Sequence, residues 1–261
     1  MTSLTAIHGV VARDLLRTMR QKSRLLGGVV RPLMWLLLVG TGFNAIAHVG
    51  GGISYQEFVY PGIVVMAALF GAMLMAISTV YDREFGVLRL MLASPAGVGA
   101  VLTGRVIAAA LVGLLQGAVV LVLAPLFLAI SAGQLLAAAG ALALGSLVSA
   151  VLGLLVAARL RSVENFAGVI NVVLFPLLFV SGALYPSALM PPPLRVVAQI
   201  NPVTYQVDLI RHALGQQAEF SVATDVIVLG GVALVLFVVT RLLFDPEQRF
   251  MVRRSSHSAA G

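Results

Sequence analysis

Apolar residues along this chain form long, nearly uninterrupted runs instead of the apolar–polar alternation of a half-buried strand. Several runs approach the ~20 residues with which a helix crosses a hydrocarbon layer about 30 Å thick. Only helices or closed barrels hydrogen-bond their whole backbone inside lipid, and continuous apolar runs indicate helices. We therefore predict a single all-α domain over residues 1–261, a polytopic membrane protein. Its six transmembrane helices are expected at residues 33–49, 58–81, 106–130, 134–158, 165–184 and 222–244.

Composition and charge agree with this prediction and set the expected orientation. Hydrophobic residues make up 60% of the chain and charged residues 10%, against about 25% charged in soluble domains. All but Arg195 and Arg211 of the 17 Lys and Arg lie before the first span, between spans two and three or four and five, or at and beyond the C-terminal end of the sixth. The positive-inside rule places these cations, and both termini, in the cytoplasm. We expect a multi-pass protein of a bacterial inner membrane, so the net charge of +7 does not indicate nucleic-acid binding.

Residues 1–24 have the pattern of an amphipathic helix that lies in the membrane interface. Arg13, Arg17, Arg20 and Arg24 recur at helical spacing and form one stripe, with apolar residues on the other side. Such a helix lies in the headgroup plane with its arginines near anionic lipid. A solvated cytoplasmic tail with helical character is the alternative interpretation.

Residues 185–221 are too long for a tight turn, while their apolar parts are too short to span a membrane. Asn201 followed by Pro202 is typical of a helix start. Asp208 is expected to pair with Arg211 or His212, three or four residues further on. We predict two short helices that re-enter the membrane from its outer side after the fifth span, where irregular backbone is tolerated if protein buries it.

Motifs for catalysis, nucleotide binding or metal binding are missing from this sequence. It has no cysteine and no HExxH, and its four histidines are scattered, so we predict no catalytic residue and no metal site. The only lysine, Lys22, follows Gln21, so the Gly-Lys pair of a phosphate-binding P-loop is absent. The middles of the six spans hold no ionisable residue, although ion-coupled carriers usually have them there. If this chain transports a substrate, we expect the energy to come from elsewhere.

A charged segment between the second and third spans, YDREFGVLRLMLASP, interrupts two uncharged runs. We predict a short cytoplasmic helix over residues 82–95, ended by Pro95, with Phe85, Leu88 and Leu92 on one face. Its first turn would hold Asp82, Arg83 and Glu84, where acidic groups favour the positive helix end. An ordinary interfacial helix would explain the apolar face but not acidic groups beside an anionic membrane, which suit a basic protein partner better.

Two blocks of sequence resemble the permease subunits of type-2 ABC exporters. REFGVLRLMLASP is similar to that family's loop between spans two and three, although the family commonly has Thr where Val87 stands. FPLLFVSGALYPSALMPPPLRVVAQINPVTYQVDLIR is similar to its span-five ending, with Ser-Gly, a Pro-bearing loop and an Asn-Pro that opens a helix ending in Arg. The resemblance covers nearly the whole chain and is nearest to the drug and lipo-oligosaccharide exporter branch.

The resemblance implies a division of labour between subunits. In that family two permeases and two ATPases form the transporter, and the ATPase subunit binds ATP and magnesium. The segment 82–95 would be the coupling helix that docks on the ATPase, 1–24 the connecting helix, and 185–221 the external gate. The chain itself would then be no enzyme and bind no cofactor, and it would work as a homodimer among membrane lipids.

The resemblance also implies candidate residues in three groups. The coupling group is Asp82, Arg83, Glu84, Phe85, Gly86 and Arg89; the gate group is Pro186, Asn201, Pro202, Asp208 and Arg211; the translocation-path group is Phe70, Met73, Asn171 and Phe175.

An apolar, uncharged path suits an amphipathic cargo such as a drug, a lipid or a glycolipid-like molecule. Two other functions remain open at this point. A self-sufficient ion-coupled carrier or channel is disfavoured by the uncharged span centres. A membrane-embedded enzyme or assembly factor would need clustered acids or histidines at a membrane surface, which the sequence does not indicate.

Overall fold

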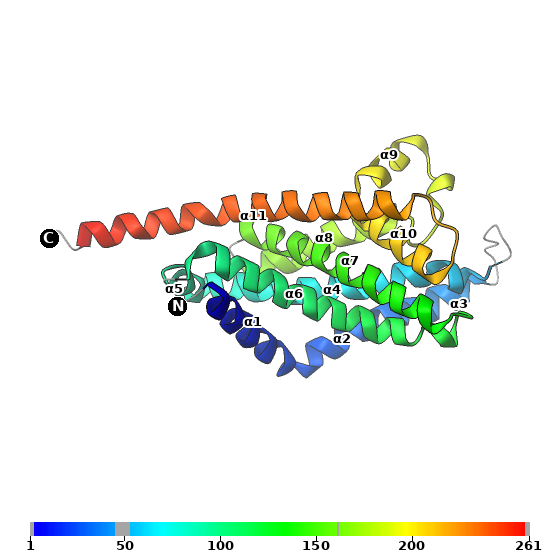
Figure 1. Ribbon diagram of the computed structural model, residues 1–261, viewed down its shortest axis with the longest axis horizontal. Coiled ribbons are helices and arrows are strands. Elements are labelled where there is room, and N and C mark those ends of the chain that lie inside the picture. The colour runs from blue at the N-terminus through cyan, green and yellow to red at the C-terminus, as the bar shows by residue number, and fades with distance from the viewer. Residues whose placement is uncertain (1–2, 45–52, 95, 161, 259–261) are drawn as a thin grey trace.

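The computed structural model describes residues 3–44, 53–94, 96–160 and 162–258, and within these ranges the regular structure is entirely helical. The helices run along the long axis of an elongated bundle (Figure 1). Six segments are long and apolar enough to cross a membrane: Lys22–Phe43, Tyr55–Glu84, Gly97–Leu126, Ala132–Arg159, Val163–Val180 and Val222–Phe244. The predicted all-α fold with six spans is confirmed.

The elements follow one another in a simple order, with η1 a π-helical turn and η2 and η3 short 3₁₀ helices. They are α1 Ser3–Met19, α2 Lys22–Trp35, η1 Leu36–Gly40, α3 Thr41–Asn44, α4 Tyr55–Glu84, α5 Val87–Leu92, α6 Gly97–Val122, η2 Ala124–Leu126, α7 Ala132–Arg159, α8 Val163–Val180, η3 Ser187–Leu189, α9 Pro192–Ile200, α10 Pro202–Leu214 and α11 Val222–Ser258.

The first span begins at Lys22, before the predicted range 33–49, so the predicted start is wrong. Helix α2 continues through Pro32 and passes through the wider turn of η1 into α3. Proline removes one helical hydrogen bond, and the π-helical turn η1 follows within four residues of Pro32. The sequence prediction placed the start too late because α2 contains cations, which lower its hydropathy. Their long side chains can nevertheless reach water from a helix end. Residues 45–49 lie outside the described residues.

Helix α4 is the central helix of the bundle. It packs against α2, α6, α7, α8 and α10, and most of its apolar stretch is buried. Its start is fixed by a capping box, in which Ser54 Oγ accepts the amide N–H of Glu57 at 3.2 Å and the Glu57 carboxylate accepts that of Ser54 at 3.3 Å. A helix that is apolar on all sides is stable only when buried. In the spans formed by α2, α8 and α11, by contrast, few residues are buried within the chain.

Glycines let α4 and α6 approach closely. A Cβ built on Gly113 would lie 2.8 Å from the carbonyl oxygen of Ala68, and one on Gly71 would lie 2.9 Å from the Cα of Gly113. A Cβ on Gly117 would lie 2.7 Å from Leu142 of α7. Small residues at such positions allow helix backbones to touch.

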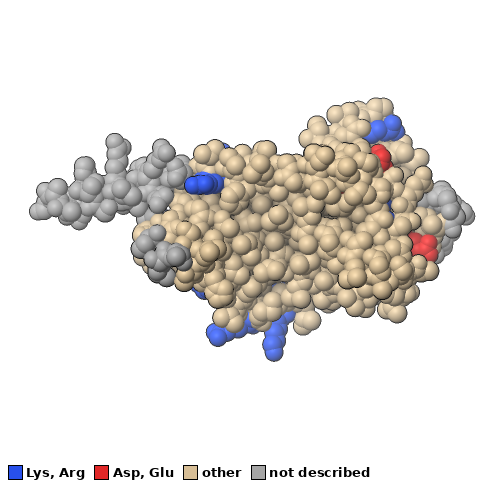
Figure 2. Space-filling model, in the orientation of Figure 1, with Lys and Arg blue, Asp and Glu red and all other residues tan. Residues whose placement is uncertain are grey.

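The two termini lie at the same end of the bundle, together with α5, while α9 and α10 lie at the opposite end (Figure 1). An even number of spans requires this arrangement. On the face drawn in Figure 2, charged side chains gather near the two ends and over the α1–α2 junction, and the surface between them is free of charge. This distribution suits a protein whose middle lies in hydrocarbon.

The segment after the fifth span folds into η3, α9 and α10. The Asn201 side chain accepts the amide N–H of Val203 at 3.0 Å, and Pro202 is the first residue of α10, so the predicted helix start is confirmed. Helix α10 ends at Gly215, whose φ of 76° places it in the left-handed region. Most of α10 is buried in protein; its entry into the membrane stays a prediction.

The prediction that Asp208 pairs with Arg211 or His212 is wrong. Within the described part of the chain, Asp208 forms no salt bridge with Arg211 or His212, and its two oxygens accept the main-chain N–H groups of Glu219 and Phe220 at 2.8 Å each. The chain reverses after α10 and brings these amides over the carboxylate. Spacing along one helix could not reveal this competition.

Candidate functional site

The charged segment between the second and third spans forms a corner between α4 and α5. Helix α4 continues to Glu84, so Asp82, Arg83 and Glu84 occupy its last turn. The predicted helix over 82–95 with these residues in its first turn is therefore wrong. Gly86 breaks the helix because its φ of 77° lies in the left-handed region that glycine adopts readily. The short helix α5 follows, and Pro95 lies outside the described residues.

Asp82 forms the centre of a buried ionic cluster, defined here as Asp82, Arg13, Arg17, Arg105 and Asp14. Arg17 donates to Asp82 at 2.8 Å, and Arg13 and Arg105 donate to its second oxygen at 2.5 Å each. Asp14, fully buried, accepts from Arg13 at 2.8 Å. The cluster joins α1, α4 and α6 at the end of the molecule that carries the termini.

Burial of these charges requires that they be paired. Asp82 is 3% exposed and Arg105 is 1% exposed, and removing Asp82 would leave the charge of Arg105 uncompensated in a poorly solvated position. Burial by itself would lower the pKa of the Arg13 guanidinium, but the carboxylates of Asp14 and Asp82 raise that pKa above its ordinary value. The ion pairs of the cluster therefore join α1, α4 and α6.

Arg83 also turns into the protein. It donates to the main-chain carbonyl oxygens of Ala157 at 2.6 Å and Leu160 at 2.8 Å, and its guanidinium lies 5.1 Å from the centre of the Phe244 ring. Carbonyls at the end of α7 lack helical partners and receive them here. Asp82 and Arg83 were expected to contact a partner, but these contacts hold both inside the chain.

The exposed part of this corner is a small surface, the docking face, defined as Glu84, Phe85, Arg89 and Leu90. Phe85 is 72% exposed and Leu90 is 75% exposed, while the Leu88 side chain between them is buried. The prediction that Phe85 shares a face with Leu88 and Leu92 is therefore wrong, because the break at Gly86 changes the direction of α5. Leu90 was missed by the sequence analysis.

Glu84 has a second contact. Its carboxylate accepts the amide N–H of Val163 at 3.3 Å, at the first turn of α8. A carboxylate is favoured at this position because the helix N-terminus carries partial positive charge. The docking face is thus connected to α8 as well as to α4.

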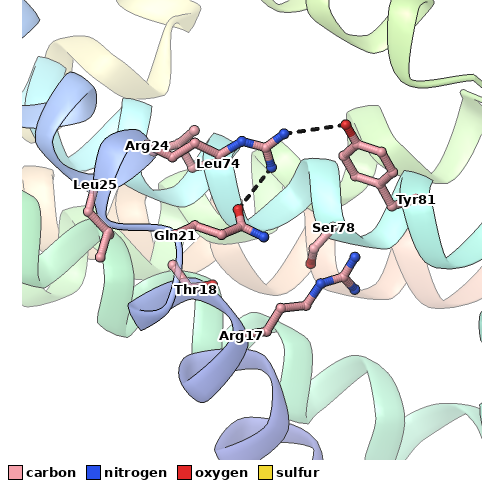
Figure 3. A pocket seen from close by; sticks show the side chains of 8 residues that line it. All are labelled: Arg17, Thr18, Gln21, Arg24, Leu25, Leu74, Ser78 and Tyr81. Atoms are coloured by element: carbon pink, nitrogen blue, oxygen red, sulfur yellow. Dashed lines mark hydrogen bonds between the residues drawn. The ribbon is translucent and has the colours of Figure 1, made fainter.

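The α1–α2 junction lies against the same end of α4 (Figure 3). Arg24 donates to Gln21 at 2.9 Å and to the Tyr81 hydroxyl at 3.3 Å, while Arg17 of the ionic cluster donates to Asp82. Three arginines of the predicted interfacial stripe, Arg13, Arg17 and Arg24, therefore contact other helices of the protein. Arg20 and Arg24 remain exposed, and their contact with lipid stays a prediction.

The predicted path residues separate into two groups. Phe70 and Met73 lie on the central helix α4 and are buried, with Arg31 stacked 4.8 Å from the centre of the Phe70 ring. In this conformation neither reaches a surface that a second copy or a cargo could contact. On α8, Asn171 is exposed and Phe175 is half-buried beside Trp35. A role in the path stays a prediction, and for Phe70 and Met73 it requires a different arrangement of α4.

The predicted gate residues lie at the opposite end of the bundle. Asn201 caps α10 and also donates to the carbonyl oxygen of Leu177 on α8 at 2.6 Å. Arg211 donates to the carbonyl oxygen of Gly182 at 2.7 Å and lies 4.5 Å from the centre of the Phe58 ring. Burial lowers the pKa of the Arg211 guanidinium. These contacts tie α10 to the end of α8.

An open cavity of about 400 Å³ lies beside these residues. Pro186 and Arg211 line it together with Phe58 and residues 216–219. The cavity brings two of the five predicted gate residues to one surface, while Asn201, Pro202 and Asp208 contribute to the packing behind it.

Comparison with known proteins identifies the family. Residues 5–214 match the family described as ABC-2 type transporter. A protein of Porphyra purpurea named transport permease ycf38 is 31% identical over 212 residues, which cover 79% of this chain and 72% of the relative. Nodulation protein J of Rhizobium leguminosarum bv. trifolii is 31% identical over 189 residues, 72% of each chain.

Members of this family are transport components, not enzymes, and normally work with an ABC ATPase subunit. The match covers the first five spans and the short helices after α8, and it ends before the sixth span. This chain is therefore a multi-pass membrane transport permease that belongs to the ABC-2 type transporter family.

Proposed function

We propose that this chain is the membrane-spanning subunit of an ATP-driven exporter in a bacterial inner membrane, with both termini in the cytoplasm. Two copies would form the translocation path, and a separate ATPase subunit would bind ATP and magnesium. The observation that carries the proposal is the docking face, where Phe85 and Leu90 expose apolar side chains at a charged end of the molecule. Apolar groups exposed at such a place are typical of a protein contact.

A push on the docking face would reach the spans through short connections. Only Phe85 and Gly86 separate α5 from the central helix α4. Leu88 and Leu92 of α5 pack in one cluster with residues of α6 and with Phe244 of α11. The ionic cluster ties the same end of α4 to α1 and α6, so this end would move as one body.

The second copy would cover apolar surface that one protomer leaves open. Helix α8 buries Leu174 and Leu178 against the bundle, whereas Asn171, Val172 and Phe179 are exposed. An interface along α8 would place Asn171 and Phe175 at the path. Because the span surfaces are apolar, the cargo we propose is an amphiphile such as a drug, a lipid or a glycolipid-like molecule.

Replacement of Leu90 by glutamate tests the docking face. We expect Leu90→Glu to reduce the amount of ATPase that copurifies with the permease by roughly tenfold or more, as for an anchor residue at an interface centre. ATP-dependent uptake of cargo into inverted vesicles, which corresponds to export from the cell, should fall with it. The measurement is the ratio of ATPase to permease after affinity purification of the co-expressed proteins.

Leu189→Glu is the matched control, because Leu189 is 77% exposed at the opposite end of the bundle. This variant should retain the ATPase. Equal ATPase retention by both variants would exclude the docking face, and uphill export by the purified permease without any ATPase would contradict the proposed function as a whole.

A further inference from the structure

Three side chains between α10 and α11 come together in a way that the sequence analysis did not predict. Asp208 and His212 lie four residues apart on one face of α10, and Asp225 lies in the first turn of α11. One potential ligand atom of each residue lies within 4.8 Å of those of the other two. From these contacts we propose that Asp208, His212 and Asp225 form a binding site for a divalent cation of the zinc class.

The buried carboxylate of Asp225 is the main observation. Asp225 is 0% exposed, and neither of its oxygens has a hydrogen-bond partner among the described residues. No salt bridge from the described cations reaches Asp225 or Asp208. An uncompensated carboxylate in such a position is costly, and a bound cation would remove that cost.

The other two residues have lone pairs that their hydrogen bonds do not use. Each oxygen of Asp208 accepts one main-chain N–H at 2.8 Å and retains a second lone pair. His212 Nε2 lies 2.5 Å from the carbonyl oxygen of Phe220, which can only accept, so Nε2 carries the proton. Nδ1 then has its lone pair available, and a main-chain carbonyl behind the ring is the usual support of a histidine that binds metal.

The donor set decides which cation fits. One imidazole nitrogen and two carboxylates suit Zn²⁺ better than Mg²⁺ or Ca²⁺, which prefer oxygen ligands alone. Ligands ~2.0–2.2 Å from a zinc ion lie up to about 4 Å apart, so small side-chain adjustments would close the site. A water molecule would complete the coordination, and the half-buried edge of His212 gives access from the surface.

Such an ion would fasten the turn between the short helices and the last span. Asp208 and His212 belong to the segment after the fifth span, whereas Asp225 begins the sixth. Binding would stabilise the folded chain because the unfolded chain lacks the site. This role does not depend on the ATPase or on the cargo.

The test is metal binding by the full-length permease, purified in detergent with a tag that contains no histidine. We expect one equivalent of Zn²⁺ per chain by elemental analysis after gel filtration. EDTA should lower the midpoint of thermal unfolding, and added Zn²⁺ should restore it. Asp225→Asn and His212→Gln should each weaken Zn²⁺ binding by roughly tenfold or more, as expected for loss of a coordinating group.

His8→Gln is the matched control, since it removes an exposed imidazole from α1 at the far end of the chain. It should retain the metal. The proposal is overturned if the wild-type protein holds no Zn²⁺ and does not respond to EDTA, or if His8→Gln loses as much metal as His212→Gln. An increase in thermal stability in Asp225→Asn without any metal in the wild type would identify a protonated carboxyl instead. Should both site variants fail to fold, the stoichiometry and EDTA response of the wild type decide the question.

Discussion

At the scale of single residues, the charged side chains near the docking face are of two kinds, buried and exposed. Asp82 and Arg105 are buried and hold helices together, whereas Glu84 and Arg89 remain at the surface. For Asp82 and Glu84 the difference follows from position on the last turn of α4, where neighbouring residues point in different directions. A charged residue close in sequence to a docking-face residue can therefore be buried, as Asp82 is near Glu84, and take no part in docking.

Asp82→Asn tests the ionic cluster. The substitution keeps the size of the side chain but removes the charge that compensates Arg105, so we expect a loss of about 3–5 kcal/mol, the range for breaking a buried ion pair. Thermal unfolding of the purified permease measures this loss as a lower midpoint. Glu164→Gln, an isosteric change at an exposed position of α8, serves as the control. Equal midpoints for the two variants would show that the cluster contributes no stability.

At the scale of elements, the contact between α4 and α6 depends on the absence of side chains. Gly113 faces the carbonyl oxygen of Ala68 at a distance that a Cβ could not occupy, and backbone cannot move aside as a flexible side chain can. By contrast, Gly140 on α7 has open space where its Cβ would lie. The same residue type thus has a packing role at one place and none at the other.

Gly113→Ala and Gly140→Ala form a matched pair for this contact. Gly113→Ala should destabilise the permease by roughly 1–3 kcal/mol, because the added methyl group separates two packed helices. Gly140→Ala should be neutral or slightly stabilising, because alanine favours helix by about 1 kcal/mol over glycine. Thermal unfolding of both proteins gives the comparison, and a Gly113→Ala protein as stable as Gly140→Ala would contradict the close packing.

At the scale of the whole molecule, the two ends differ in what they offer. One end holds the termini, the ionic cluster and the docking face, and the other holds α9, α10 and the open cavity. Force applied at the first end and cargo release at the second would need the spans between them to move. The central position of α4, which connects both ends, makes it the element through which such a movement would pass.

The absence of cysteine allows a direct test of the proposed orientation. Ala93→Cys places a thiol beside α5, and Gln217→Cys places one at the opposite end; both positions are exposed. In intact cells with a permeable outer membrane, an impermeant maleimide should label Gln217→Cys and leave Ala93→Cys unlabelled. Lysis should make both reactive. The opposite labelling pattern would place the termini outside the cytoplasm.

The sequence predicted the fold better than the site. Six apolar runs and the Asn201–Pro202 cap were sufficient for the spans and for the start of α10, and both are confirmed. The corner at Gly86 was missed because a glycine after a charged turn is compatible with a continuing helix as well as with a break. Leu90 and Arg105 were missed because exposure and burial depend on neighbours that are distant in the chain.

What the sequence alone determined about this protein is local: the length of each apolar run, the start of α10, the imbalance of positive charge between loops, and the blocks that identify the family. These follow from interactions of a residue with lipid, water or its own helix. Only the tertiary structure decided which charges meet, as Asp82 does with three arginines and Asp225 with Asp208 and His212. Such meetings depend on the rotation and approach of whole helices, which packing sets and no short stretch of sequence contains.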